Sequence, residues 1–325
     1  MSKEQPLVSV IMPVYNEARY LSEAIESVLA QTYKNIELII FDNCSKDNSA
    51  EIARRYAEQD TRVRFYEDSE HLHYVVLSTN YTFSKISADS EYCKVVYGDD
   101  WIFPECIERM VQVAVSDPEV VIVSAFTMLE EKVWLHGLPY KQSIYPGDEI
   151  CKRFMGEGQY YFGSPNALLF KANEDMRNNC FFEDFLPFTD AHKCMELLRD
   201  GKFGFVHQVL TFSRRENEST ISAMHLYGFF EMHRFTTIIR YGQDFYNAAE
   251  YEQVVQPMEK MYLRKFAKGL FFEGKDYWKF HKEQWDVVGY QLSKFKLAKA
   301  AVYAFLYELA CPREILDKAL QRMRS

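Results

Sequence analysis

Two adjacent carboxylates follow a glycine at Gly98-Asp99-Asp100. Side by side they repel each other and need solvent or a cation, and carboxylate oxygens are ligands that suit a hard divalent metal such as Mn2+ or Mg2+. The alternative is an ordinary solvated turn in which one of the two caps a helix that begins near Pro104. The metal site is favoured because further polar groups are predicted at the same edge of the fold.

Strand-like and helix-like segments alternate through the first two thirds of the chain. Apolar, β-branched runs predict buried strands, and apolar residues at i, i+3, i+4 and i+7 predict amphipathic helices between them. The predicted strands cover residues 7–14, 37–41, 63–66, 95–97, 120–123 and 203–206, with Pro13 ending the first, and the predicted helices begin near residues 21, 47, 80, 107 and 189. This order predicts an α/β domain with a mainly parallel central sheet.

Three polar clusters follow predicted strands of this sheet. They are Tyr15-Asn16-Glu17 after the first strand, Asp42-Asn43 after the second and Asp99-Asp100 after the fourth. Ligands of such sheets bind beyond the carboxyl ends of the strands, so we expect these clusters to lie together. The chain has no GxGxxG or GxxxxGK[ST] motif after the first strand, so a bound nucleotide would need a metal to neutralise its phosphates.

The motifs around these clusters, taken together, resemble family 2 glycosyltransferases with the GT-A fold. The matching stretches are Val8-Ser-Val-Ile-Met-Pro-Val-Tyr-Asn-Glu17, Ala24-Ile-Glu-Ser-Val-Leu-Ala-Gln-Thr-Tyr33, Glu37-Leu-Ile-Ile-Phe-Asp-Asn43 and Ser45-Lys-Asp-Asn-Ser49, and the similarity covers residues 6–222. The resemblance implies inverting transfer of a sugar from a nucleotide-sugar donor, with UDP- or dTDP-sugars favoured. It also implies a hydroxyl acceptor on a glycan or lipid-linked molecule, in bacterial surface polysaccharide synthesis.

The resemblance also assigns roles to individual residues. Asp190 is carried over as the general base, with Glu183 and Asp184 in reserve, and its alternative role is a helix N-cap. Asn80 is carried over to the donor site, with a helix-start cap as its alternative. The implied donor-binding residues are Pro13, Tyr15, Glu17, Asp42, Asn80, Asp99 and Arg214, and the implied metal ligands are Asp99 and Asp100.

Two positions depart from the family pattern. Tyr97 stands where many relatives have the first acid of Asp-x-Asp-Asp, so register alone does not show which of Asp99 and Asp100 ligates the metal. Glu216 stands where the family has a histidine, which leaves a third-ligand role open. Two rival functions remain at this point. One is a sugar-phosphate nucleotidyltransferase, and the other is a non-catalytic nucleotide-sugar-binding protein.

Composition limits the class of protein and its surroundings. The chain has 325 residues, of which 48% are hydrophobic, and a net charge of −9, which argues against nucleic-acid binding. We expect a cytoplasmic protein, because no signal peptide or run of about 18 apolar residues is present and the seven cysteines show no CxxC pair.

A change in charge and pattern predicts a domain boundary near residues 220–230. Residues 1–224 carry 22 Lys and Arg against 35 Asp and Glu, whereas residues 225–325 carry 16 against 12 and have helical spacing. We expect a catalytic domain over 1–224 and a helical domain over 225–325 that forms a homo-oligomer or contacts the inner face of a membrane. Lys294, Lys296 and Lys299 beside Phe295 and Leu297 favour a solvated helix, with an interfacial membrane contact as the alternative.

Overall fold

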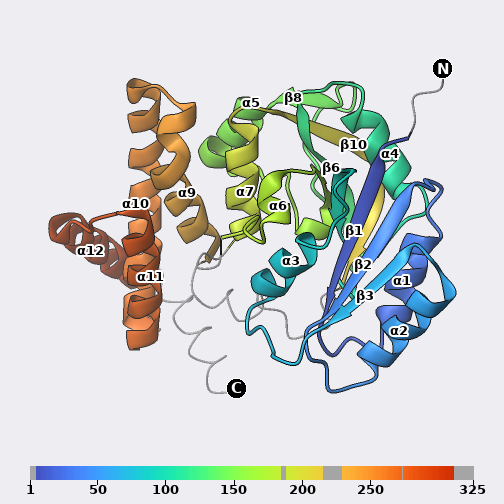
Figure 1. The fold of residues 1–325 in the computed structure, drawn as a ribbon. Helices are drawn as coiled ribbons and strands as arrows, with labels where there is room; N and C mark the ends of the chain where they lie inside the picture. The colour runs from blue at the N-terminus through green and yellow to red at the C-terminus, as the bar shows by residue number, and fades with distance from the viewer. Residues whose placement is uncertain (1–4, 184–187, 215–228, 273, 311–325) are drawn as a thin grey trace. The chain divides into compact units, whose positions relative to one another are not determined.

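The structure is a computed structural model that describes residues 5–183, 188–214, 229–272 and 274–310 (Figure 1). The chain divides into two compact units. The first comprises Met1–Phe154 and Gln159–Asn217, and the second comprises Met155–Gly158 and Glu218–Ser325. The predicted boundary between residues 224 and 225 falls at 215–228, outside the described residues, and stays a prediction.

A mainly parallel sheet forms the centre of the first unit, as predicted. Its strand order is β3-β2-β1-β4-β9-β6-β10-β5, in which β9 and β5 run antiparallel to their neighbours. Two short strands, β7 and β8, pair with β6 and β10. The bounds are β1 Leu7–Val14, β2 Ile36–Asp42, β3 Val63–Glu67, β4 Ser90–Val95, β5 Trp101–Ile102, β6 Val120–Leu129, β7 Lys132–Trp134, β8 Ile144–Pro146, β9 Leu168–Lys171 and β10 Lys202–Ser213.

Helices cover both faces of this sheet (Figure 1). Alternate residues of β1 from Val8 to Val14 pack in one apolar cluster with α1, α2 and α4, because successive side chains of a strand point to opposite faces. On the other face, Phe41 of β2 packs against Tyr81 of α3 with 4.4 Å between ring centroids. The helices of the unit are α1 Leu21–Leu29, α2 Ser49–Gln59, α3 Val75–Phe83, α4 Cys106–Ala114, α5 Gly147–Lys152, α6 Glu174–Arg177 and α7 Thr189–Leu198, with short η2 Pro165–Ala167. The short η1 Arg153–Glu157 begins in this unit and ends in Met155–Gly158 of the second.

Two strand ends differ from their predictions. Pro13 does not end β1, which continues to Val14, paired with Asp42 of β2. The strand predicted over 95–97 instead ends at Val95, because a turn begins beyond it in which the Asp100 N–H donates to the Tyr97 carbonyl (3.1 Å). The two carboxylates therefore lie on a turn rather than directly on a strand end.

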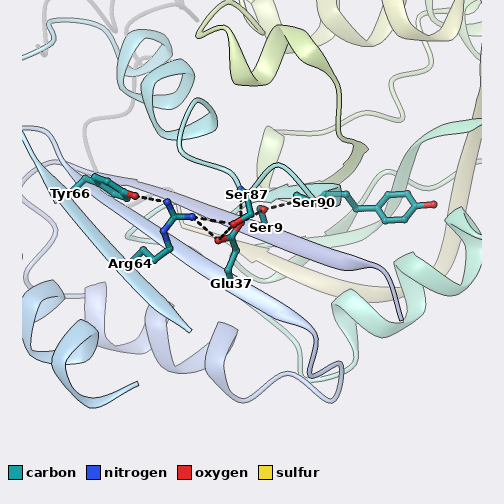
Figure 2. Close-up of polar contacts among 7 residues, drawn as sticks. Ser9, Glu37, Arg64, Tyr66, Ser87 and Ser90 are labelled. Carbon is teal, nitrogen blue, oxygen red and sulfur yellow. Dashed lines mark hydrogen bonds and ion pairs between the residues drawn. The ribbon is translucent and has the colours of Figure 1, made fainter. Parts of the chain in front are cut away.

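A buried polar network ties β1, β2 and β3 together (Figure 2). The Glu37 carboxylate accepts hydrogen bonds from Ser9 Oγ (2.5 Å), Ser87 N and Oγ (both 2.8 Å) and Arg64 Nη1 (2.8 Å). Burial alone would raise the pKa of Glu37, but these hydrogen bonds hold it below its usual value. Ser9 and Glu37 pair across β1 and β2 near the start of both strands, so the network fixes the end of the sheet away from the polar clusters.

The described part of the second unit is helical. It contains α9 Phe229–Phe245, α10 Ala248–Phe272, α11 Gly274–Val288 and α12 Lys294–Ala310. Its core is aromatic and includes buried Tyr262, whose hydroxyl meets His281 Nδ1 (2.6 Å) and accepts a hydrogen bond from Trp285 Nε1 (2.8 Å). Among the helices that the structure describes, none is both long and apolar enough to cross a membrane.

Candidate active site

Hydrogen bonds lock the loop after β1 against the loop after β2. The Asn16 N–H donates to Ser45 Oγ (2.9 Å), the Lys46 N–H donates to Asn16 Oδ1 (2.7 Å) and the Glu17 N–H donates to Ser49 Oγ (2.9 Å). Asn16 has a φ of 58°, a left-handed conformation that asparagine tolerates better than most residues. The first two polar clusters are therefore held together, as the sheet topology predicts.

Asp42 is the last residue of β2, and the second of these two loops begins directly after it. Its side chain is buried, and Oδ2 accepts a hydrogen bond from the Ser45 N–H (2.9 Å). Within the described residues, the buried Oδ1 atom has no hydrogen-bond partner. A buried carboxylate oxygen without a partner is costly, so a ligand that donates a hydrogen bond would be favoured there.

Tyr15 and His71 form an aromatic pair beside Asp42. Tyr15 is 40% exposed, and its ring centroid lies 4.3 Å from that of His71. Asn43 holds the loop that carries His71, because its amide exchanges two hydrogen bonds with the Leu72 backbone (both 2.8 Å) and its carbonyl meets His71 Nδ1 (3.0 Å). His71 was not predicted as a site residue, although it follows the third predicted strand at the same edge of the sheet.

Glu17 and the Gly98-Asp99-Asp100 turn lie against each other. A Cβ atom added at Gly98 would come within 3.1 Å of the Glu17 Cβ, which explains the glycine before the two acids. Burial, and then repulsion from Asp99 and Asp47, raises the pKa of Glu17 to about 8. Burial, and then repulsion from Asp99, raises the pKa of Asp100 to about 8. A cation placed among these carboxylates would relieve the repulsion.

The structure distinguishes Asp99 from Asp100. Asp100 is buried, and its two oxygens accept hydrogen bonds from Ser213 Oγ (3.1 Å) and the Arg214 N–H (3.0 Å). Asp99 is partly exposed. The alternative in which either residue caps the following helix is wrong, because β5 intervenes and the N-cap of α4 is Glu105.

A buried chain of hydrogen bonds supports Asp100 from behind. Asn166 Nδ2 donates to Ser213 Oγ (3.2 Å), and Lys94 Nζ donates to the Asn166 carbonyl (2.6 Å). Lys94 is fully buried, and burial lowers its pKa. None of Lys94, Asn166 and Ser213 was singled out from the sequence, because their partners are 47 to 113 residues away along the chain.

Arg214 holds the same turn from the outside. Its Nε donates to the Asp99 carbonyl (2.8 Å), its Nη2 forms an ion pair with Glu23, and its guanidinium lies over the Tyr20 ring (4.2 Å to the centroid). These contacts leave the side chain 17% exposed. Arg214 thus stabilises the acidic turn through its contacts with Asp99, Glu23 and Tyr20.

The fit of these residues to a divalent metal rests on the Asp99 and Asp100 oxygens. In the part of the chain that the structure describes, no group of three or more His, Cys, Asp or Glu side chains is arranged to hold an ion. One or two carboxylates with substrate phosphate oxygens are a usual arrangement for Mg2+ at nucleotide sites, so the donor set fits a metal that arrives with its substrate. Glu216, whose role was left open, lies outside the described residues.

Asp190 lies in the first turn of α7, as predicted. The alternative of an N-cap is wrong for both Asp190 and Thr189, because the N-cap residue is Phe188, with φ 59°, and both acid and threonine are inside the helix. Desolvation raises the pKa of Asp190 to about 6, a value suited to a base that works near neutral pH. Of the reserve candidates, Glu183 is exposed and Asp184 lies outside the described residues.

Tyr97 links the acidic turn to Asp190. Burial and then the nearby Asp190 carboxylate raise the pKa of Tyr97, whose hydroxyl also shares a hydrogen bond with Thr79. Asp99 and Asp100 act on the same hydroxyl more weakly. The residue that replaces the first acid of the family pattern therefore lies near both the proposed metal ligands and the proposed base.

Asn80 has a structural contact in place of the predicted cap. It lies inside α3 rather than at its start, so the helix-start alternative is wrong. Its side chain is buried, and its amide exchanges two hydrogen bonds with the Phe182 backbone, with Nδ2 donating to the carbonyl (2.7 Å) and Oδ1 accepting from the N–H (2.8 Å). Both amide groups are engaged by protein, which makes Asn80 an anchor for the segment that precedes α7.

The chain is similar to several known glycosyltransferases. The family model described as "Glycosyl transferase family 2" matches residues 9–177. The chain is 40% identical over 222 residues to the glycosyltransferase GlyG of Streptococcus pneumoniae, a match that covers 66% of this chain and 72% of that protein. It is 35% identical over 231 residues to an uncharacterized glycosyltransferase of Rickettsia typhi, covering 66% of each chain.

Two solved structures share the fold at low sequence identity. The structure of S. aureus TarS 1-349 in complex with UDP-GlcNAc matches with a TM-score of 0.62 and 15% identity, covering 87% of this chain and 79% of that one. The mannosyltransferase PcManGT from Pyrobaculum calidifontis, in complex with GDP-Man and Mn2+, matches with a TM-score of 0.54 and 15% identity, covering 94% and 88%.

Proposed function

Because the chain belongs to glycosyl transferase family 2 and is a glycosyltransferase with the GT-A fold, we propose the chemistry of its site in more detail. We propose a metal-dependent inverting enzyme that transfers a sugar from a UDP- or dTDP-sugar to an acceptor hydroxyl. The observation that carries the proposal is the meeting of Asp42, Glu17 and Asp99 at one sheet edge. Hydrogen bonds join the loops after β1 and β2, and Gly98 packs against Glu17.

We propose that Asp42 and Tyr15 bind the base of the nucleotide. The buried, unpartnered Oδ1 of Asp42 would accept the N3–H of a uracil or thymine ring, and the exposed Tyr15 ring, backed by His71, offers a flat face for stacking. The complex of TarS with UDP-GlcNAc supports a uridine donor. The complex of PcManGT with GDP-Man makes a guanine nucleotide the necessary comparison in any binding experiment.

We propose that Asp99 ligates the metal and that Asp100 positions the turn. Asp99 is the more accessible of the two, whereas both Asp100 oxygens already accept hydrogen bonds from protein groups. A bound divalent cation would stabilise the negative charge of the departing diphosphate. Arg214 would contact that diphosphate only after exchanging Glu23 for a phosphate oxygen, which is a chemically similar partner.

We propose that Asp190 is the general base. In an inverting reaction the acceptor oxygen attacks the anomeric carbon while its proton passes to a carboxylate and the bond to the diphosphate breaks. The pKa of about 6 leaves Asp190 ionised at neutral pH yet basic enough to take that proton. Tyr97 and Tyr160 both lie close enough to Asp190 for its carboxylate to raise their pKa values, after burial. We propose that these phenols help to hold the acceptor beside the base.

For the acceptor we propose a chemical class and no individual compound. We propose a hydroxyl of a glycan or of a lipid-linked molecule, in bacterial surface polysaccharide synthesis, with the protein working in the cytoplasm. The support is the resemblance of residues 6–222 to enzymes of that kind and the bacterial relatives described above.

The proposal that Asp42 binds the nucleotide base is tested by Asp42→Asn. The substitution turns one acceptor face of the side chain into a donor and removes a charge-assisted hydrogen bond, which costs on the order of 1.5–3 kcal/mol of binding, or about 10- to 150-fold in Kd for UDP. Calorimetry with UDP, dTDP and GDP in the presence of Mn2+ measures it. Asp60→Asn is the matched control, since Asp60 pairs with Arg62 beyond the far end of α2 and should leave UDP affinity unchanged. Unchanged UDP affinity in Asp42→Asn would remove Asp42 from the site.

A further inference from the structure

One face of α12 carries large apolar side chains that are exposed to solvent. Phe295 is 79% exposed, Val302 59%, Leu306 58% and Phe305 57%. Phe295, Val302 and Leu306 recur at i, i+7 and i+11, which places them on one face of the helix. Scattered exposed apolar residues are ordinary, but several on one helical face usually mark an interaction surface.

Contacts with α10 on the opposite side of α12 determine which face of the helix is exposed. Lys296 forms an ion pair with Glu259 of α10 (2.5 Å), and Ala300 is buried. The Arg264 guanidinium of α10 lies over the ring of Tyr303, 3.7 Å from its centroid. Lys296, Ala300 and Tyr303 therefore mark the side of α12 that contacts α10, although Lys296 and Tyr303 also stay partly exposed.

The charge on the same face is positive. Lys294 and Lys299 are exposed, and residues 294–307 contain no acidic residue. Lys299 lies four residues after Phe295 and three before Val302, in the middle of the apolar stripe. An apolar stripe interleaved with lysines suits the boundary between lipid headgroups and acyl chains, because the lysine stems lie along the apolar surface and the ammonium groups reach the phosphates.

We propose that this α12 face, comprising Lys294, Phe295, Lys299, Val302, Phe305 and Leu306, docks on the surface of a membrane that contains anionic lipid. A second copy of the chain fits less well. A two-fold contact through this face would bury Lys299 near its own equivalent, and like charges in an apolar contact repel. Phosphate groups of anionic lipids supply the opposite charge that the face lacks.

Docking of this kind is independent of the donor and metal assignments. The bilayer contact would be interfacial, because α12 as described has 17 residues and no described helix is both long and apolar enough to span a bilayer. A transferase held at the surface would also meet a lipid-linked acceptor at high local concentration, and that consequence alone rests on the proposed function.

The experiment is flotation of the full chain with vesicles of phosphatidylcholine, with and without about one third phosphatidylglycerol, at about 0.05 M and 0.5 M salt, since the higher salt shortens the screening length severalfold. We expect binding to the anionic vesicles at low salt and its loss at high salt. Phe295→Ser with Phe305→Ser should lower the partition coefficient at least about 10-fold. Lys294→Glu with Lys299→Glu should lower it about 10-fold on anionic vesicles only.

Matched controls come from other helices of the same unit. Phe230→Ser removes a 50% exposed aromatic from α9, and Lys279→Glu reverses an exposed charge on α11, and both should float like the parent. Circular dichroism and UDP binding should be unchanged in every variant. Failure of the parent to float, or equal flotation of the α12 variants, would overturn the proposal. A dimer mass in light scattering that only the α12 variants lose, without flotation of the parent, would overturn it in favour of a second copy of the chain.

Discussion

Replacing Asp190 by asparagine is expected to lower kcat by roughly 100-fold or more while leaving donor and metal affinity nearly unchanged, because general base catalysis is worth about that much. The parent should also lose activity as the pH falls through about 6, where Asp190 takes up the proton that prevents it from acting as a base. Steady-state kinetics from pH 5 to 8, together with calorimetry of UDP binding, would measure both effects.

Stability separates this role from a structural one. Folding raises the pKa of Asp190, so the ionised carboxylate is disfavoured by folding above its unfolded pKa, and loss of the charge should not lower the free energy of unfolding at neutral pH. Asp200→Asn is the matched control, because Asp200 is exposed just beyond the other end of α7. Weakened UDP binding, or destabilisation of about 1 kcal/mol as for a lost cap, would argue for a structural role.

The second large effect is expected at the acidic turn. Asp99→Ala should weaken Mn2+-dependent UDP binding by more than about 100-fold and abolish turnover, since loss of a residue that only supports a metal ligand already costs about 10–100-fold. Its thermal stability should be close to that of the parent, because repulsion from Asp99 raises the pKa values of Glu17 and Asp100 and its removal relieves that strain. Calorimetry with UDP at varied Mn2+ and a thermal melt would measure both.

Asp100→Ala should behave differently. It would leave the Ser213 hydroxyl and the Arg214 N–H without their buried acceptor, so we expect both weaker UDP binding and a loss of stability of about 1–3 kcal/mol. Asp100→Asn keeps an acceptor oxygen and should recover part of that stability. The reverse pattern, with Asp99→Ala unfolded and Asp100→Ala folded but unable to bind metal, would exchange the two roles.

Local patterns in the sequence were enough to predict the main strands and helices of the first unit. The apolar run Leu7–Val14, the helix from Leu21 and the start of α7 at Thr189 all follow from hydrophobic period or helix-start signals. Parallel strands end at the same edge of a sheet, so Glu17 and Asp42 could be predicted to lie close together on neighbouring loops although they are 25 residues apart. The identity of the family came from the residues on those loops.

Long-range hydrogen bonds explain what the sequence did not reveal. Asn80 binds the backbone of Phe182, 102 residues away, a contact that no local pattern indicates, and its role in donor binding stays a prediction. Asp100 is buried, and it accepts hydrogen bonds from Ser213 and Arg214, which reach it from the end of β10 and beyond. Such pairings have no local period, so the sequence pattern does not indicate them.

The central claim, metal-dependent sugar transfer at the edge where Asp42, Asp99 and Asp190 are proposed to act, is tested most directly by nucleotide release. The full chain would be incubated with a panel of UDP-, dTDP- and GDP-sugars and Mn2+, and the products separated by chromatography before and after chelation with EDTA. We predict release of a nucleoside diphosphate from a UDP- or dTDP-sugar, its loss on chelation and its return with added Mn2+. Turnover that survives chelation, pyrophosphate release from a nucleoside triphosphate and a sugar phosphate, or binding of nucleotide-sugars without any release would contradict it.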